Sequence, residues 1–67
     1  MITIVVNGAK RELARESSVA DLVHVLALEG KRIAVELNGV IVPRSRYAGT
    51  PLSSGDRVEI VGAVGGG

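Results

Sequence analysis

Cysteine is absent from this 67-residue chain, which excludes disulfides, thiolate metal sites and cysteine nucleophiles. Aromatic residues are almost absent too, since Tyr47 is the only one, and the chain offers no aromatic platform on which nucleic-acid bases would stack. No apolar run approaches the roughly 20 residues that span a bilayer, and Met1 leads directly into a strand pattern instead of a signal peptide. We therefore expect a cytoplasmic protein that does not enter a membrane.

A large excess of one charge is also missing. Eight basic and seven acidic residues give a net charge of +1, and the basic residues are scattered along the chain, so nucleic-acid binding is not expected. The single histidine, His24, has no second histidine and no cysteine to join it in a metal site. We expect no metal and no catalytic role for His24.

What the chain does contain is a high proportion of aliphatic residues. Apolar residues make up 46% of the sequence against 22% charged, which is the balance of a chain that folds. A chain of this length forms one small domain with a modest core, and it has no room for both a substrate cleft and a catalytic apparatus. We expect a protein that is not itself an enzyme.

The first part of the chain reads as a hairpin followed by a helix. Apolar side chains alternate over residues 2–6, Asn7-Gly8 is typical of a type I′ turn, and a return strand is expected over residues 9–14. Ser18 and Asp21 then form a capping-box pattern that predicts the start of a helix, and we expect that helix to stop at Gly30. The predicted apolar stripe of the helix comprises Val19, Leu22, Val23 and Leu26.

The second part reads as three further strands. Residues 33–37 and 40–42 flank another turn signal, Asn38-Gly39, and the shorter strand ends at Pro43. Residues 44–54 show no clear period, although Leu52 is expected in the core. Gly55-Asp56 then turns the chain into a last strand over residues 57–61, where Val58 and Ile60 share one face.

This order of elements predicts an α+β fold of the β-grasp, or ubiquitin-like, type. A mixed sheet would pack on one helix, with the first and last strands side by side at its centre. We expect a folded domain over residues 1–62 and a flexible C-terminal tail over residues 63–67.

The chain ends in Gly65-Gly66-Gly67, and this glycine end is its most informative feature. Because glycine has no side chain and tolerates most backbone angles, such a tail is able to thread a narrow channel and present its terminal carboxylate to a reagent. The alternative is an ordinary flexible terminus without a function of its own.

Several segments together resemble the ThiS family, the sulfur carriers of thiamine biosynthesis within the ThiS/MoaD group of ubiquitin-like proteins. They are the run from Leu37 to Arg44, the run from Gly55 to Ile60, and the ending Val64-Gly65-Gly66-Gly67. The resemblance covers essentially the whole chain. Gly65 is an additional glycine before the Gly66-Gly67 pair that matches the family.

The resemblance implies a carrier whose C-terminal Gly67 is adenylated and converted to a thiocarboxylate, while Gly66 and Gly65 enter the partner's channel. Its partners would be a ThiF-type adenylyltransferase, a ThiG-type thiazole synthase that accepts the sulfur, and a sulfur donor such as a cysteine desulfurase system. This chain has no phosphate-binding glycine loop, so ATP would be used by the adenylyltransferase and no cofactor would be bound here.

Other functions remain open at this point. A small subunit of molybdopterin synthase, another sulfur carrier or a ubiquitin-like modifier would use the same activated end. A noncovalent β-grasp interaction module would not need it. For any of these, the candidate partner face is the sheet face away from the helix, where Val5 and Val61 are predicted to be exposed; Arg44 is a further candidate contact.

Overall fold

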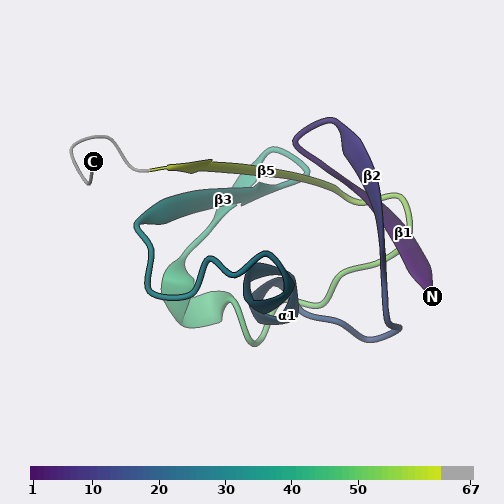
Figure 1. The fold of residues 1–67 in the computed structure, drawn as a ribbon, viewed down its shortest axis with the longest axis horizontal. Coiled ribbons are helices and arrows are strands. Elements are labelled where there is room, and N and C mark those ends of the chain that lie inside the picture. The colour runs from purple at the N-terminus through teal and green to yellow at the C-terminus, as the bar shows by residue number, and fades with distance from the viewer. Residues whose placement is uncertain (63–67) are drawn as a thin grey trace.

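The α-helix α1 (Val19–Val25) packs under a curved five-stranded sheet in the computed structural model of this chain (Figure 1). The structure describes residues 1–62. Its elements are β1 (Ile2–Val6), β2 (Ala9–Leu13), α1 (Val19–Val25), β3 (Ile33–Leu37), β4 (Val40–Val42), the 3-10 helix η1 (Arg44–Arg46) and β5 (Arg57–Gly62). The strand order across the sheet is β2-β1-β5-β3-β4.

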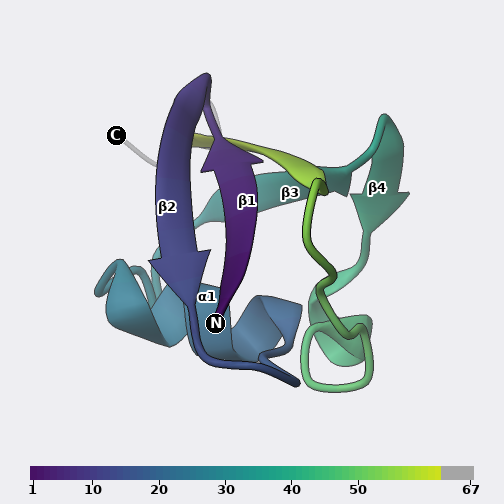
Figure 2. The ribbon, with the colours of Figure 1, turned by 90° about the vertical axis from the view of Figure 1, so that its right-hand side faces the viewer.

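The strand order puts β1 and β5 together in the middle of the sheet. They run parallel, with Val5 opposite Arg57 and Val6 opposite Val58, whereas β1–β2, β3–β4 and β3–β5 are antiparallel pairs. The predicted mixed sheet with adjacent first and last strands is therefore confirmed. Figure 2 shows the two hairpins on either side of β5, with the helix below them.

Both predicted Asn-Gly turns are present. Asn7 and Gly8 have φ angles of 49° and 84°, and Asn38 and Gly39 have φ angles of 51° and 85°. A type I′ turn requires positive φ at both central residues, and asparagine and glycine adopt such angles at low cost. Each turn therefore joins two neighbouring antiparallel strands through two residues.

The helix begins where its capping signals predict. The Asp21 amide donates to the Ser18 hydroxyl oxygen at 3.2 Å, and the Ser18 amide donates to the Asp21 carboxylate at 2.8 Å, which completes a capping box. The Asp21 pKa is lowered mainly by the hydrogen bond from the Ser18 backbone and then by that from the Ser18 side chain. The helix presents Val19, Leu22 and Val23 to the sheet, and all three are buried.

The predicted helix end at Gly30 is wrong. The helix ends at Val25 with Leu26 as its C-cap, and the next residue, Ala27, adopts a left-handed φ of 58°. The Ala27 amide donates to the His24 carbonyl at 2.9 Å and the Leu28 amide donates to the Val23 carbonyl at 3.0 Å. These two bonds form a Schellman motif in which alanine stands where glycine is usual, which is why a search for glycine placed the end too late.

The remaining connection, residues 43–56, closes the core from the side. It contains η1, and it buries Tyr47 and Leu52, the latter as expected. Ser18 and Pro51 form an isolated bridge that ties this segment to the start of the helix. The central side chains of the core are fully buried: Ile4, Val19, Leu22, Val35 and Val58. Within residues 1–62, no helix has the length and apolar character needed to cross a membrane.

Candidate functional site

The predicted carrier residue Gly67, with Gly66 and Gly65 before it, lies outside the described residues, as does the whole predicted tail over residues 63–67. The nearest described position is Gly62, the last residue of β5. The site is therefore built here from β5, which leads to that end, and from the surface around it.

Strand β5 is held along both sides. On one side it pairs with β3 from Leu37 opposite Val58 to Ile33 opposite Gly62. On the other side it pairs with β1, which reaches only as far as Val6 opposite Val58. In Figure 1, β5 runs from β1 across the molecule directly above β3. The C-terminal half of β5 thus extends past the end of β1.

An asparagine side chain continues the ladder where β1 stops. The Asn7 side chain accepts from the Ile60 amide at 2.7 Å and donates to the Ile60 carbonyl at 3.0 Å. A primary amide carries one acceptor and two donors, so it reproduces the pair of bonds that a neighbouring strand would make. Asn7 therefore acts both as a turn residue and as a substitute for one residue of strand.

The second hairpin turn holds the opposite end of β5 in a similar way. The Asn38 side-chain oxygen accepts from the Arg57 amide at 2.9 Å, and the Asn38 side-chain nitrogen donates to the Asp56 carboxylate at 3.1 Å. The two Asn-Gly turns, far apart in sequence, thus hold the same strand at its first residue, Arg57, and at Ile60 in its second half. The sequence pattern identified both asparagines as turn residues and gave no signal for this second role.

The sheet face away from the helix is the predicted partner face. Val61 is 58% exposed on it, and the exposed Ala34 lies opposite Val61 on β3. Val5 points to the same face but is half-buried, which corrects the expectation that it would be exposed. Arg44 is not on this face: it lies in η1, lines a hollow beside the helix and donates to the Lys31 carbonyl at 3.1 Å.

Two carboxylates stand next to each other at the middle of this face. Glu36 and Glu59 are directly opposed on β3 and β5, both are exposed, and Ile41 follows in the same row on β4 with 67% exposure. Like charges directly opposite each other destabilise a sheet. A partner that placed a basic group over this pair, with apolar contacts to Val61 and Ile41, would relieve the repulsion.

Within residues 1–62, no three His, Asp or Glu side chains are arranged to hold a metal ion. The side chain of His24, to which no role was assigned, is 77% exposed and hydrogen-bonds with the Glu29 carboxylate beyond the helix end. The hydrogen bond from His24 lowers the Glu29 pKa. This exposed pair lies away from β5 and the outer sheet face.

The topology and the site together define the class of the protein. A mixed sheet of order β2-β1-β5-β3-β4 on one helix, with its C-terminal strand at the centre, is a β-grasp, ubiquitin-like domain. The model of the ThiS family matches residues 4–67, and the chain belongs to the ThiS family.

Solved structures agree with this assignment. The crystal structure of the thiamine biosynthesis protein ThiS from Geobacter metallireducens superposes with a TM-score of 0.84 at 30% identity, covering 98% of this chain and 100% of that one. A solution structure of a thiamine biosynthesis protein from the same organism gives a TM-score of 0.79 at 30% identity, covering 98% and 88% of the two chains.

Similar sequences occur in proteins of different lengths. A thiazole synthase of Paramagnetospirillum magneticum is 39% identical over 64 residues, which is 96% of this chain and 20% of that protein. The chain thus spans about a fifth of that relative. The uncharacterized protein ycf40 of Pyropia yezoensis is 33% identical over 66 residues, which is 98% of this chain and 93% of that protein.

Proposed function

We propose that this protein is a sulfur carrier in thiamine biosynthesis whose C-terminal Gly67 is adenylated and converted to a thiocarboxylate. The observation that carries the proposal is the family match, which extends through Gly67 and so includes the glycine end. The thiamine biosynthesis proteins that share the fold over nearly the whole chain support it. In this role the chain is a carrier that partner enzymes act on, and it is not a catalyst.

The chemistry explains why such a carrier needs a partner with ATP. A carboxylate resists nucleophilic attack, so one of its oxygens first attacks the α-phosphorus of ATP, and pyrophosphate leaves. The resulting acyl-adenylate has AMP as a good leaving group. The outer sulfur of a persulfide on the donor then attacks the carbonyl carbon and AMP departs, which gives an acyl disulfide. A thiol reductant cleaves the S–S bond of this disulfide and is itself oxidised to a disulfide, so that sulfur has replaced one carboxylate oxygen. A ThiF-type adenylyltransferase would supply the ATP site.

The absence of cysteine suits this reaction. The sulfur is carried on the backbone carbonyl of Gly67, so the chain does not need a thiol of its own. It also contains no cysteine that would compete with the sulfur donor for the activated end. Gly65 and Gly66 would let the end pass through a narrow channel, because neither residue has a side chain.

A ThiG-type thiazole synthase is the proposed acceptor of the sulfur. One relative is itself a thiazole synthase, and a fifth of that protein resembles almost the whole of this chain. A carrier domain and its acceptor joined in one polypeptide would gain from a high effective concentration. This relative therefore supports the proposal that a ThiS-family domain meets a thiazole synthase.

Docking on these partners is proposed to use the outer sheet face around Val61, together with the Glu36–Glu59 pair. This face and the end of β5 are continuous, so a partner that covers the face also lies beside Gly62, the last described residue. Val5 contributes a half-buried apolar side chain to this surface. Arg44, on the other side of the molecule, is left out of the proposed face.

Intact mass spectrometry tests the chemistry. The full chain and a chain lacking Gly66-Gly67 are incubated with a ThiF-type adenylyltransferase, ATP and a sulfur donor. The proposal expects a gain equal to the difference between sulfur and oxygen in the full chain alone. If several competent partners produce no gain while both chains remain folded, the carrier function is wrong and a noncovalent module is favoured.

Paired substitutions test the docking face. Val61→Asp places a charge at the centre of the proposed contact and should raise the KM for the carrier in the adenylation reaction by about tenfold or more. Val25→Asp is the matched control, because Val25 is 54% exposed on the helix, away from this face. Equal KM values for the two variants would remove the outer face from the proposal.

A further inference from the structure

The exposed edge of β4 and a groove beside it form a second surface, which adjoins the outer sheet face at Ile41. Strand β4 is at the margin of the sheet, paired only with β3 within residues 1–62. Val40 and Ile41 are each 67% exposed, an unusual placement for two large apolar side chains on so short a strand. The function proposed above does not use this surface.

The register shows which backbone groups are open at this edge. Leu37 and Val40 close a two-residue turn, so they form a hydrogen-bonded pair of the antiparallel ladder. Hydrogen-bonded and non-hydrogen-bonded pairs alternate along such a ladder, so the next pair, Glu36 and Ile41, is non-hydrogen-bonded. The Ile41 amide and carbonyl consequently point away from β3 toward the free edge. An extended segment lying there would form two backbone hydrogen bonds with Ile41 alone.

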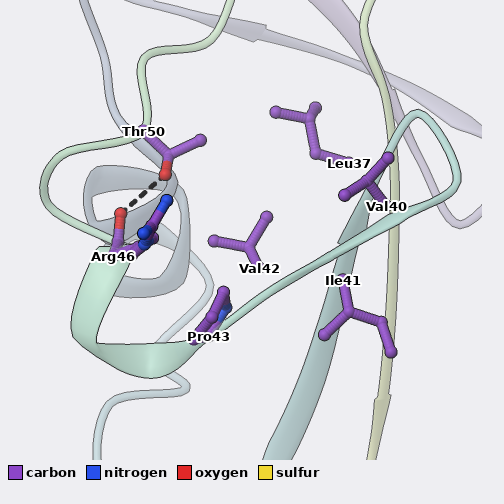
Figure 3. A pocket seen from close by; sticks show the side chains of 7 residues that line it. All are labelled: Leu37, Val40, Ile41, Val42, Pro43, Arg46 and Thr50. Carbon is purple, nitrogen blue, oxygen red and sulfur yellow. Dashed lines mark hydrogen bonds between the residues drawn. The ribbon is translucent and has the colours of Figure 1, made fainter.

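The groove lies on the helix side of β4. It encloses about 440 Å³. Its lining residues are Leu37, Val40, Ile41, Val42, Pro43, Arg46 and Thr50. Figure 3 shows an apolar end at Leu37 and Val40, with Val42 at the middle and Arg46 and Thr50 at the other end. Apolar and polar contacts are thus separated along the groove.

Charge sets the chemistry of the polar end. Arg46 is exposed and is the sole charged residue that lines the groove, and no carboxylate of residues 1–62 forms an ion pair with it. The hydroxyl of Thr50 donates to the Arg46 carbonyl at 2.6 Å, which fixes the backbone from which the guanidinium projects. The guanidinium group of an arginine presented in this way is suited to bind a carboxylate through charge-assisted hydrogen bonds.

We propose that the β4 edge binds an extended segment of a partner protein by strand addition, with an apolar side chain over Val40 and an acidic side chain at Arg46. Alternate side chains of a strand share one face, so an apolar residue and an acidic residue separated by one position fit this arrangement. A second copy of this chain fits less well, because its own β4 is Val-Ile-Val and brings no carboxylate to Arg46.

The test uses the full chain labelled with ¹⁵N and a synthetic peptide of alternating threonine and valine that ends in glutamate, with its C-terminus amidated so that the glutamate side chain carries the only carboxylate. We expect saturable shifts of the amide signals confined to residues 38–50, with Ile41 among the largest. A matched peptide ending in lysine should bind at least about tenfold more weakly, since the charge-assisted hydrogen bond to Arg46 is lost.

Two variants separate the two parts of the surface. Arg46→Gln should weaken the binding of the glutamate peptide by about tenfold and leave the binding of the lysine peptide unchanged. Ile41→Pro removes the outward amide, and proline is tolerated on an edge strand where that group faces solvent, so the variant should fold and lose both peptides. Arg11→Gln, on β2 at the opposite edge of the sheet, should bind like the original chain.

Any of three results would overturn the proposal. They are the absence of saturable shifts at millimolar peptide, equal binding of the two peptides, and shifts centred on β2 or on the outer face. A doubling of molecular mass without peptide that Ile41→Pro abolishes would also overturn it, in favour of a second copy as the occupant. None of these results bears on the mass-spectrometric test of Gly67, so the two proposals fail independently.

Discussion

At the scale of single residues, the most informative finding is that asparagine serves two purposes in each hairpin turn. Asn7 and Asn38 adopt positive φ angles, and their side chains also bind the backbone of β5 at Ile60 and Arg57. Glycine would satisfy the first requirement but not the second. The side-chain amides therefore connect the two hairpins to the strand between them.

Replacing each asparagine with glycine separates the two purposes. Asn7→Gly keeps the turn and removes both bonds to Ile60, so we expect a loss of about 1–2 kcal/mol in the free energy of unfolding. Hydrogen exchange should accelerate at the Ile60 amide in this variant, and at the Arg57 amide in Asn38→Gly. Acceleration of both amides in both variants would mean that the substitutions loosen the sheet as a whole.

The Asp21 carboxylate gives a prediction about pH. Because its pKa in the folded protein lies below its ordinary value of 3.8, its contribution to stability is complete above that value and is lost as pH falls through the lower folded value. The difference in melting temperature between the original chain and Asp21→Asn should therefore shrink on acidification. A difference that stayed constant down to the acid-unfolded state would contradict this role of the capping box.

At the scale of secondary structure, the strands and their turns followed from the sequence because their signals are local. Alternation of apolar side chains and the Asn-Gly pairs correctly predict β1, β3 and β4. Strand β2 ends one residue before the predicted 9–14, and β5 extends one residue beyond the predicted 57–61. The helix start was also predictable, since Ser18 and Asp21 are three residues apart. Its end was not, because Ala27 adopts an angle that the sequence gives no reason to expect of alanine.

The unusual alanine provides a stabilising substitution. A left-handed angle costs an L-residue roughly 1–2 kcal/mol, and glycine avoids this while losing some chain entropy, so Ala27→Gly should raise the free energy of unfolding by about 0.5–1 kcal/mol. Ala20→Gly, inside the same helix, should lower it by about 1 kcal/mol. Urea denaturation of both variants measures the two effects, and a destabilised Ala27→Gly would show that the Schellman motif does not form in solution.

The candidate site was predicted less completely than the fold, for a physical reason. The outer face depends on strand register, and the alternation correctly assigned Val61 to it but did not give the degree of burial of Val5. The opposition of Glu36 and Glu59 arises from two strands far apart in sequence, so no local pattern signals it. The position of Arg44 was missed because residues 44–54 carry no period.

At the scale of the whole molecule, stability depends on a small aliphatic core. Leu22 on the helix and Ile4 on β1 have no exposed surface. Leu22→Ala or Ile4→Ala should lower the free energy of unfolding by about 2–5 kcal/mol through lost burial and the cavity left behind. Since a core of this size supplies only about 3–5 kcal/mol, either change is expected to unfold a large fraction of the protein.

Thermal unfolding measures this prediction, and the same helix offers a control. Val25 is 54% exposed, and alanine favours helix more than valine does, so Val25→Ala should change the stability by less than about 0.5 kcal/mol. A small effect of Leu22→Ala together with a large effect of Val25→Ala would mean that the opposite side of the helix faces the sheet.

The central place of β5 also determines when a newly made chain is able to fold. Each hairpin joins segments that are neighbours in sequence, but β5 lies between the two hairpins and pairs Val58 with Val6. The two hairpins are therefore not joined into one sheet until residues 57–62 are available. Such distant pairing closes a long loop, which slows folding and favours a single cooperative step. A chain still attached to the ribosome is therefore expected to stay protease-sensitive until β5 has emerged, and then to fold in a single cooperative step.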